Sequence, residues 1–137
     1  MAELRDIGER LVDFGAAIIK LLHRLPPSSI GKKIEDQMVR SAMSSGANYE
    51  EARGAGSRAD FCNKLQISLK EMRETRYWLV LTEKAGLIEG DSITGLVNVV
   101  PTFRIQMFFE PVDSRFRLSD ILAGCGCWCS RIAQLVF

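Results

Sequence analysis

The fold is decided by residues Gln37 to Leu79, which read QMVRSAMSSGANYEEARGAGSRADFCNKLQISLKEMRETRYWL. The first half of this stretch is rich in small residues, and the second half carries apolar residues at helical spacing. Two glycines, Gly54 and Gly56, separate the halves and are typical of a helix end. The stretch predicts two helices that approach closely and expose a polar surface to a partner, and it holds no obvious catalytic set.

The helix before these glycines is predicted to begin near Ser28 or Ser29, either of which can cap it. Its apolar face begins with Ile30, Ile34, Met38 and Val39. A run of small residues then lets a neighbouring helix come close, and it comprises Ser41, Ala42, Ser44, Ser45, Gly46 and Ala47. Glycine inside a helix costs about 1 kcal/mol against alanine, so a packing reason for Gly46 is expected.

The helix after the glycines is predicted from about Arg58 to Lys84. Ser57 followed by Asp60 resembles a capping box with Asp in place of Glu. The apolar seam runs through Phe61, Leu65, Met72 and Leu79, interrupted by Ser68 and Thr75. Gly86 is predicted to end this helix.

An earlier helix is indicated by two interleaved heptad series with 3-4 spacing. One series is Leu4, Leu11, Ile18 and Leu25, and the other is Ile7, Phe14 and Leu21. This helix is expected to end at Leu25, because a residue before proline avoids the helical region and Pro26 follows.

Beyond Gly86 the pattern changes. Asp91 or Ser92 could cap a fourth helix, but Pro101 comes early for a full-length one. The alternation of Phe103, Ile105, Met107 and Phe109 with polar residues indicates a strand. We therefore predict a bundle domain over residues 1–98 and an atypical tail over 99–137.

The bulk composition fits one globular domain of 137 residues with 47% hydrophobic residues. A net charge of +1 provides no overall field toward nucleic acid or an anionic membrane. The N-terminus lacks the layout of a secretory signal, and no apolar run could span a bilayer. A cytoplasmic location with reduced cysteines is the expectation.

A spaced set of residues across the centre of the chain resembles a known family. The set is Leu25-Pro26, Gly31, Ile34, Gln37, Arg40-Ser41, Ser44, Ala47-Asn48, Glu50-Glu51-Ala52, Ser57, Asp60-Phe61, Lys64-Leu65, Ile67, Lys70-Glu71 and Glu74 to Leu79. It resembles, over about residues 4–98, the bacterial four-helix-bundle proteins first found encoded in intervening sequences of 23S ribosomal RNA genes.

The resemblance implies an antiparallel up-down bundle that assembles into a ring, most often a pentamer, with no enzymatic activity. A related bundle protein accompanies reverse transcriptases in diversity-generating retroelements and binds the transcriptase and nucleic acid. After Asn98 this chain departs from the family's Glu/Leu/Ile-rich continuation. Our hypothesis is that a frameshift or gene-end rearrangement replaced most of the fourth helix.

Residues that could serve catalysis or metal binding have simpler structural interpretations. His23 is the only histidine and has no paired nucleophile in the sequence. Cys125, Cys127 and Cys129 are spaced more tightly than zinc ligands usually are. A di-metal bundle site needs Glu-x-x-His motifs, which are absent. We therefore expect no catalytic site, metal, cofactor or small-molecule substrate.

The glutamates are instead expected to form ion pairs at helical spacing, as in Glu50 with Arg53 and Lys70 with Glu74. Four polar residues are candidates for the helix interface: Ser41, Ser44, Asn48 and Glu51. Of these, Asn48 and Glu51 are expected to hydrogen-bond across helices.

A partner surface could lie on the same two helices. Its candidate basic residues are Arg40, Arg53, Arg58, Lys64, Arg73 and Arg76. A solvated surface is the simpler interpretation, and a patch for nucleic acid or a polymerase is the alternative. Tyr77 and Trp78 are candidate aromatic anchors, either within the bundle and between subunits or as platforms for base stacking.

Together these observations predict an all-α, antiparallel up-down four-helix bundle with an atypical or truncated fourth helix. The expected function is non-enzymatic self-assembly into a homo-oligomeric, pentamer-like ring. The alternative is a nucleic-acid-binding or reverse-transcriptase accessory factor.

Overall fold

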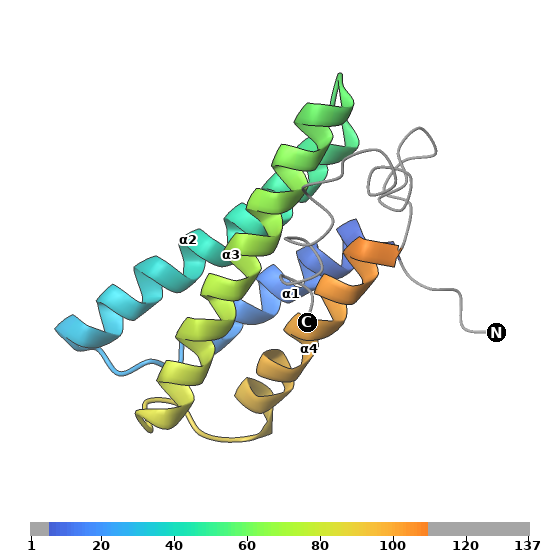
Figure 1. Cartoon of the computed structure of the whole chain (residues 1–137). Helices are drawn as coiled ribbons and strands as arrows, with labels where there is room; N and C mark the ends of the chain where they lie inside the picture. The colour runs from blue at the N-terminus through green and yellow to red at the C-terminus, as the bar shows by residue number, and fades with distance from the viewer. Residues whose placement is uncertain (1–5, 110–137) are drawn as a thin grey trace.

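The computed structural model describes residues 6–109, which form four α-helices and no strand (Figure 1). The helices are α1 (Ile7–Leu22), α2 (Ser29–Arg53), α3 (Arg58–Lys84) and α4 (Asp91–Phe109). The predictions made for Leu4 and for Cys125, Cys127 and Cys129 fall outside the described residues.

Each helix packs against the next, and α4 returns to pack against α1. The predicted all-α up-down four-helix bundle is therefore confirmed. The central pair, α2 and α3, is also the longest, with 25 and 27 residues. Figure 1 shows these two helices side by side along their length, with α1 and α4 alongside.

The seam of α1 lies in the core as its spacing predicted. Ile7, Leu11, Phe14, Ile18 and Leu21 are all buried. The helix ends at Leu22 rather than at Leu25. The amides of Arg24 and Leu25 bond to the carbonyls three residues back, so the chain tightens into turns before it reaches the prolines.

The ends of α2 and α3 follow the capping signals in the sequence. Ser28 Oγ accepts a hydrogen bond from the Gly31 amide at 3.0 Å. Ser57 Oγ accepts one from the Asp60 amide at 3.2 Å. Each bond satisfies an amide in the first helical turn that has no partner within the helix. Gly86, which follows α3, has a φ of +64°, a conformation that glycine adopts without strain.

The α2–α3 interface is built on buried hydroxyl groups. Thr75 Oγ1 lies 2.9 Å from Ser41 Oγ, and Ser68 Oγ donates to the Ser45 carbonyl at 2.7 Å. These four side chains are fully buried, so small polar residues allow the close approach that the sequence predicted. The apolar face of α2 begins later than predicted, because Ile30 is 65% exposed.

The predicted strand over residues 103–109 is wrong, because these residues complete α4. Apolar residues also recur here at helical spacing, and that series faces the core: Ile93, Val97, Val100, Phe103 and Met107. The alternating residue Ile105 is 47% exposed. Asp91 is the first residue of α4 rather than its cap. At this position its negative charge interacts favourably with the positive end of the helix dipole.

Pro101 lies inside α4, which bends along its length (Figure 1). Proline has no amide hydrogen for the carbonyl four residues back and crowds it, so a bend is expected. Phe103 nevertheless packs edge-on against Phe14 of α1 at 5.6 Å between ring centroids. The boundary expected at residue 98 lies within α4, and residues beyond it contribute to the core.

Candidate functional site

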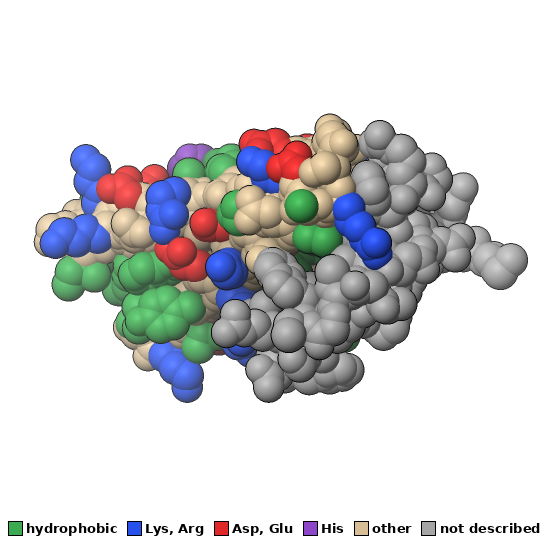
Figure 2. Space-filling model, turned by 45° about the horizontal axis from the view of Figure 1, so that its top comes forward, with side chains coloured by type: hydrophobic (Ala, Val, Ile, Leu, Met, Phe, Trp, Pro, Cys, Tyr) green, Lys and Arg blue, Asp and Glu red, His purple; other side chains and the backbone are tan. Residues whose placement is uncertain are grey.

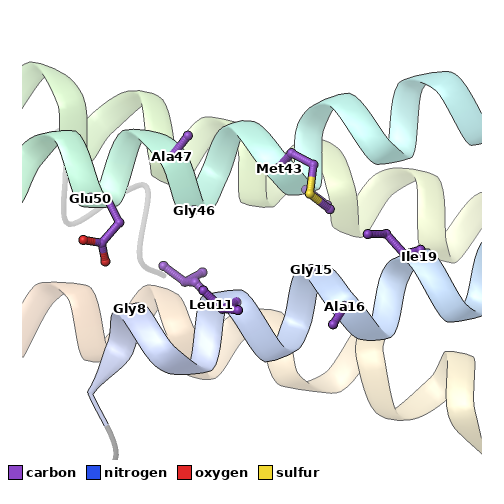
Figure 3. A pocket seen from close by; sticks show the side chains of 11 residues that line it. Gly8, Leu11, Gly15, Ala16, Ile19, Met43, Gly46, Ala47 and Glu50 are labelled. Carbon is purple, nitrogen blue, oxygen red and sulfur yellow. The ribbon is translucent and has the colours of Figure 1, made fainter.

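A groove runs between α1 and α2 on the outside of the bundle (Figure 3). Its volume is about 400 Å³. Glycine, alanine and apolar residues form most of its lining. From α1 come Gly8, Leu11, Val12, Gly15, Ala16 and Ile19, and from α2 come Ala42, Met43, Gly46, Ala47 and Glu50.

Glycines hold the floor of this α1–α2 groove open. A Cβ on Gly8 would overlap the Glu50 carboxylate, and one on Gly15 would lie 3.3 Å from Met43 Cε. At Gly46 the nearest atom would be Leu11 Cβ at 3.8 Å. Figure 3 shows Leu11 and Met43 reaching from the two helices into the space between them. The small residues of α2 therefore serve two neighbours, with Ser41 and Ser45 toward α3 and Gly46 toward α1.

Large apolar side chains border the α1–α2 groove and remain accessible. Val12 is 70% exposed, Ile19 is 45% exposed and Met43 is 36% exposed. This surface was not predicted from the sequence, because the heptad pattern of α1 marks only the seam that is buried. The available signal was the pair Val12 and Ile19, which stand off that seam and are seven residues apart on one face.

Three of the predicted basic residues form ion pairs within the bundle. Arg40 on α2 contacts the carboxylates of Glu74 at 2.5 Å and Glu71 at 3.9 Å on α3. Arg53 pairs with Asp6 at 3.1 Å and with Glu50 at 3.2 Å. Lys64 on α3 bonds to Glu51 on α2. The pairs of Arg40 and Lys64 link α2 to α3, and the expected Glu50–Arg53 pair forms within α2.

Two of these pairs change a pKa. The Glu51 carboxylate raises the pKa of Lys64 by accepting its hydrogen bond and through its charge. Glu50, and then Asp6, raise the pKa of Arg53 by their negative charge. A cation whose pKa is raised in the folded state adds stability below its unfolded-state pKa, and that contribution is lost as the pH rises through the folded value. Both pairs are therefore intact at neutral pH.

The other predicted cations lie on the surface of α3. Arg58 is exposed at the start of the helix, and Arg73 and Arg76 are exposed further along. Neither Arg73 nor Arg76 forms an ion pair with another residue of the described range 6–109. The structure therefore does not gather the six basic residues into one patch. Figure 2 shows acidic and basic side chains interspersed on the face in view.

One exposed line of α3 does carry cations together with apolar groups. Its residues recur every three or four positions and so share a face: Lys70, Arg73, Tyr77, Leu81 and Lys84. We call this line the α3 ridge. Tyr77 is 60% exposed and Leu81 is 37% exposed, so its centre is apolar and its ends are positive. Glu74 bonds to Arg40 instead of forming the expected pair with Lys70.

The predicted interface polar residues have different positions. Ser41 is buried between α2 and α3, and Glu51 reaches across to Lys64. Asn48 Nδ2 instead donates within its own helix, to the Ser44 carbonyl at 2.8 Å and to Ser44 Oγ at 3.1 Å. The hydrogen bond expected across helices thus forms at Glu51, whereas the bonds from Asn48 to Ser44 stay within α2.

The two candidate aromatic anchors are neighbours with different environments. Trp78 is half-buried against the core and donates its ring N–H to Glu74 Oε1 at 3.3 Å. Tyr77 contacts Trp78 edge-on, with 5.2 Å between ring centroids, and faces outward. Trp78 therefore packs within the bundle, and Tyr77 is the one available to a partner.

His23 is exposed in the turn after α1. Within residues 6–109, no group of three or more His, Cys, Asp or Glu side chains is arranged to hold a metal ion. Among the same residues, no helix combines the length and apolar character needed to cross a membrane.

Comparison with known proteins identifies a matching family and a similar crystal structure. The family model described as 23S rRNA-intervening sequence protein matches residues 6–102. A crystal structure from Bacteroides thetaiotaomicron, of a protein with unknown function from the S23 ribosomal protein family, is 33% identical to this chain. The match covers 75% of this chain and 95% of that one, with a TM-score of 0.69. No curated protein matches this chain.

Proposed function

Because the chain belongs to the 23S rRNA-intervening sequence protein family, we propose that it is a non-enzymatic helical-bundle protein that self-assembles into a homo-oligomeric, pentamer-like ring. The observation that carries this proposal is the α1–α2 groove with its exposed apolar border. We also propose that the protein is located in the cytoplasm.

The groove supports self-assembly because it leaves apolar surface in water on a well-packed bundle. Val12 is the most exposed of its large apolar side chains, and Ile19 and Met43 extend the same surface. A contiguous apolar surface of this kind commonly marks a protein interface. The glycines and alanines of the floor let another helix approach the α1 and α2 backbones.

The test is the solution mass of the full-length chain, measured by light scattering beside an Ala47→Leu variant. Ala47 is exposed in the groove, so the added atoms fill the groove without overpacking the core. We expect an oligomer for the natural chain and a smaller particle with unchanged helix content for the variant. A natural chain that stays monomeric at high concentration would refute the proposal.

A second candidate function is that of a nucleic-acid-binding or reverse-transcriptase accessory factor. It is favoured by Arg73 and Arg76, which form no ion pair within residues 6–109, together with the exposed ring of Tyr77. Cations bind phosphates and an aromatic ring can stack on a base. In a ring, these modest charges would repeat by symmetry and act together.

This candidate is tested by the salt dependence of binding to single-stranded and duplex oligonucleotides. Phosphate contacts make the affinity fall steeply as salt increases. The double variant Arg73→Gln/Arg76→Gln is expected to weaken binding and flatten that salt dependence. Arg40→Gln is the control, because Arg40 is already occupied by Glu74. Equal binding by all three proteins would rule this surface out.

A further inference from the structure

We propose that assembly is head-to-tail, with the α3 ridge of one copy seated in the α1–α2 groove of the next copy. This inference rests on the proposed self-assembly and assigns the two surfaces that meet. It follows from the shape, apolar content and charge of the two surfaces on the same chain.

The apolar parts of the two surfaces are complementary in shape. The ridge presents Tyr77 and Leu81, one turn apart on the convex outer face of α3. The groove is concave between α1 and α2, with Gly15, Gly46 and Ala47 along its floor and sides. A protruding aromatic ring inserted into a pocket of small residues is the kind of contact that dominates protein interfaces.

The charges of the two surfaces are also complementary. Lys70 and Arg73 lie at one end of the ridge and Lys84 lies at the other. On the α2 side, Met43, Ala47 and Glu50 line the groove, and the same helix face continues past Met43 to Asp36, which lies beyond the groove. The ridge therefore has an apolar centre between positive ends. At the Glu50 end of the groove, the two carboxylates of Glu50 and Asp6 flank the single cation of Arg53, so that end keeps a net negative charge.

The spacing of these charges matches as well. Asp36 and Glu50 are separated by the same number of residues as Lys70 and Lys84, about 21 Å along an α-helix at ~1.5 Å per residue. Asp36 is exposed. Glu50 already pairs with Arg53, yet its side chain remains 54% exposed and can accept a second cation. A ridge helix laid along α2 would thus bring a cation to each carboxylate.

Pairing a surface with itself is less favourable. Two grooves face to face would bring carboxylates together, and two ridges would bring lysines and arginines together, and like charges in contact weaken an interface. A groove that takes a ridge leaves one free groove and one free ridge on each pair of copies. Further copies add until the ends meet, which is how a heterologous interface generates a ring.

The experiment uses two full-length variants, each altered on one surface. Ala47→Lys places a long cation in the groove, and Tyr77→Asp places a carboxylate at the centre of the ridge. Both positions are exposed, so the helix content measured by circular dichroism should equal that of the natural chain. Ile30→Lys and Ile30→Asp are matched controls, since Ile30 is 65% exposed on α2 and belongs to neither surface.

We expect each variant alone to be monomeric at a concentration where the natural chain is assembled, and the Ile30 controls to assemble normally. Mixing the two variants should restore assembly, beginning with a heterodimer. The intact ridge of the Ala47→Lys copy can enter the intact groove of the Tyr77→Asp copy, and the two altered surfaces carry opposite charges that attract each other. Tyr77→Phe should assemble like the natural chain.

Two results would overturn this inference alone. One is an unchanged oligomer mass for Tyr77→Asp, and if that variant then loses oligonucleotide binding the ridge serves nucleic acid instead. The other is a mixture that stays monomeric while the natural chain assembles. A natural chain that does not assemble would overturn the proposed function together with the inference.

Discussion

Phe14 and Phe103 show how single side chains join the first helix to the last. Their rings meet edge-on, and the Arg10 guanidinium lies 4.6 Å from the centroid of the Phe103 ring. Both phenylalanines are buried, so this contact closes the bundle between α1 and α4. A cation over an aromatic face adds a favourable electrostatic term to the apolar burial.

We predict that Phe14→Ala lowers the free energy of unfolding by about 3 kcal/mol or more, because the lost burial leaves a cavity beside Phe103. Denaturant unfolding followed by circular dichroism measures this change. Ile30→Ala, at a site on α2 that is 65% exposed and outside both candidate surfaces, is the control and should change stability by less than ~0.5 kcal/mol. A loss below ~1 kcal/mol for Phe14→Ala would contradict the packing described.

A second residue-scale prediction concerns the hydroxyls between α2 and α3. Ser41→Ala leaves Thr75 without its partner across the interface, and Thr75→Val leaves Ser41 likewise. Each single change should cost ~1 kcal/mol or more, whereas the double variant should cost less than the sum, because the one hydrogen bond between Ser41 and Thr75 can be lost only once. Strictly additive losses in a double-mutant cycle would show that the two hydroxyls do not interact.

At the scale of the helix, the sequence predicted what depends on local signals. The start of α2 follows from Ser28 and the start of α3 from Ser57, because a cap acts on the amides next to it. The strand expected over residues 103–109 failed because alternation and helical spacing coexist there, and only packing against Phe14 distinguishes them. Local pattern cannot decide when two periods fit the same residues.

The candidate surfaces were predicted less well than the helices. The Glu50–Arg53 pair was predicted from its spacing within one helix, but the partners of Arg40 and Lys64 and the second partner of Arg53 were not, because they lie on other elements. The α1–α2 groove was missed for a similar reason, since Val12 and Met43 are distant in sequence and border one groove only in the folded bundle. Contacts between helices can be predicted only when the arrangement of the helices is known, and the spacing of residues along one helix does not give that arrangement.

Two glycines with opposite environments give an element-scale prediction. A Cβ at Gly31 would overlap the Pro26 carbonyl oxygen, whereas one at Gly46 would lie at an ordinary distance from Leu11. Gly31→Ala should therefore lower the thermal midpoint, and Gly46→Ala should raise it by improving helix propensity by up to ~1 kcal/mol. Differential scanning calorimetry compares the two variants. A higher midpoint for Gly31→Ala would contradict the tight turn between α1 and α2.

The bend of α4 gives another element-scale prediction. Pro101→Ala supplies the missing amide hydrogen to the carbonyl four residues back and removes the clash of the ring. The variant should be more stable by about 1–3 kcal/mol in urea unfolding, with slightly higher helix content by circular dichroism. Equal or lower stability would mean that the bend positions Phe103 and Met107 for packing in a way that a straighter helix cannot.

At the scale of the whole molecule, the bundle has a closely packed core and two outer surfaces on which apolar side chains remain exposed. The core contains residues from all four helices, including Phe61 of α3 and Ile93 of α4. Outside it, apolar side chains remain exposed along the α1–α2 groove and at the centre of the α3 ridge. Because the core is already packed without these two surfaces, they are not needed for the stability of a single bundle. Their complementary charges suit contact between copies.

Native mass spectrometry of the full-length chain tests self-assembly most directly, because it counts subunits in each particle. The account predicts a closed oligomer of one defined size above the dimer, which Ala47→Lys reduces to monomers while Ile30→Lys leaves it intact. Monomers alone at every concentration tested, or an oligomer that Ala47→Lys does not disturb, would contradict the assignment of the α1–α2 groove as the assembly surface.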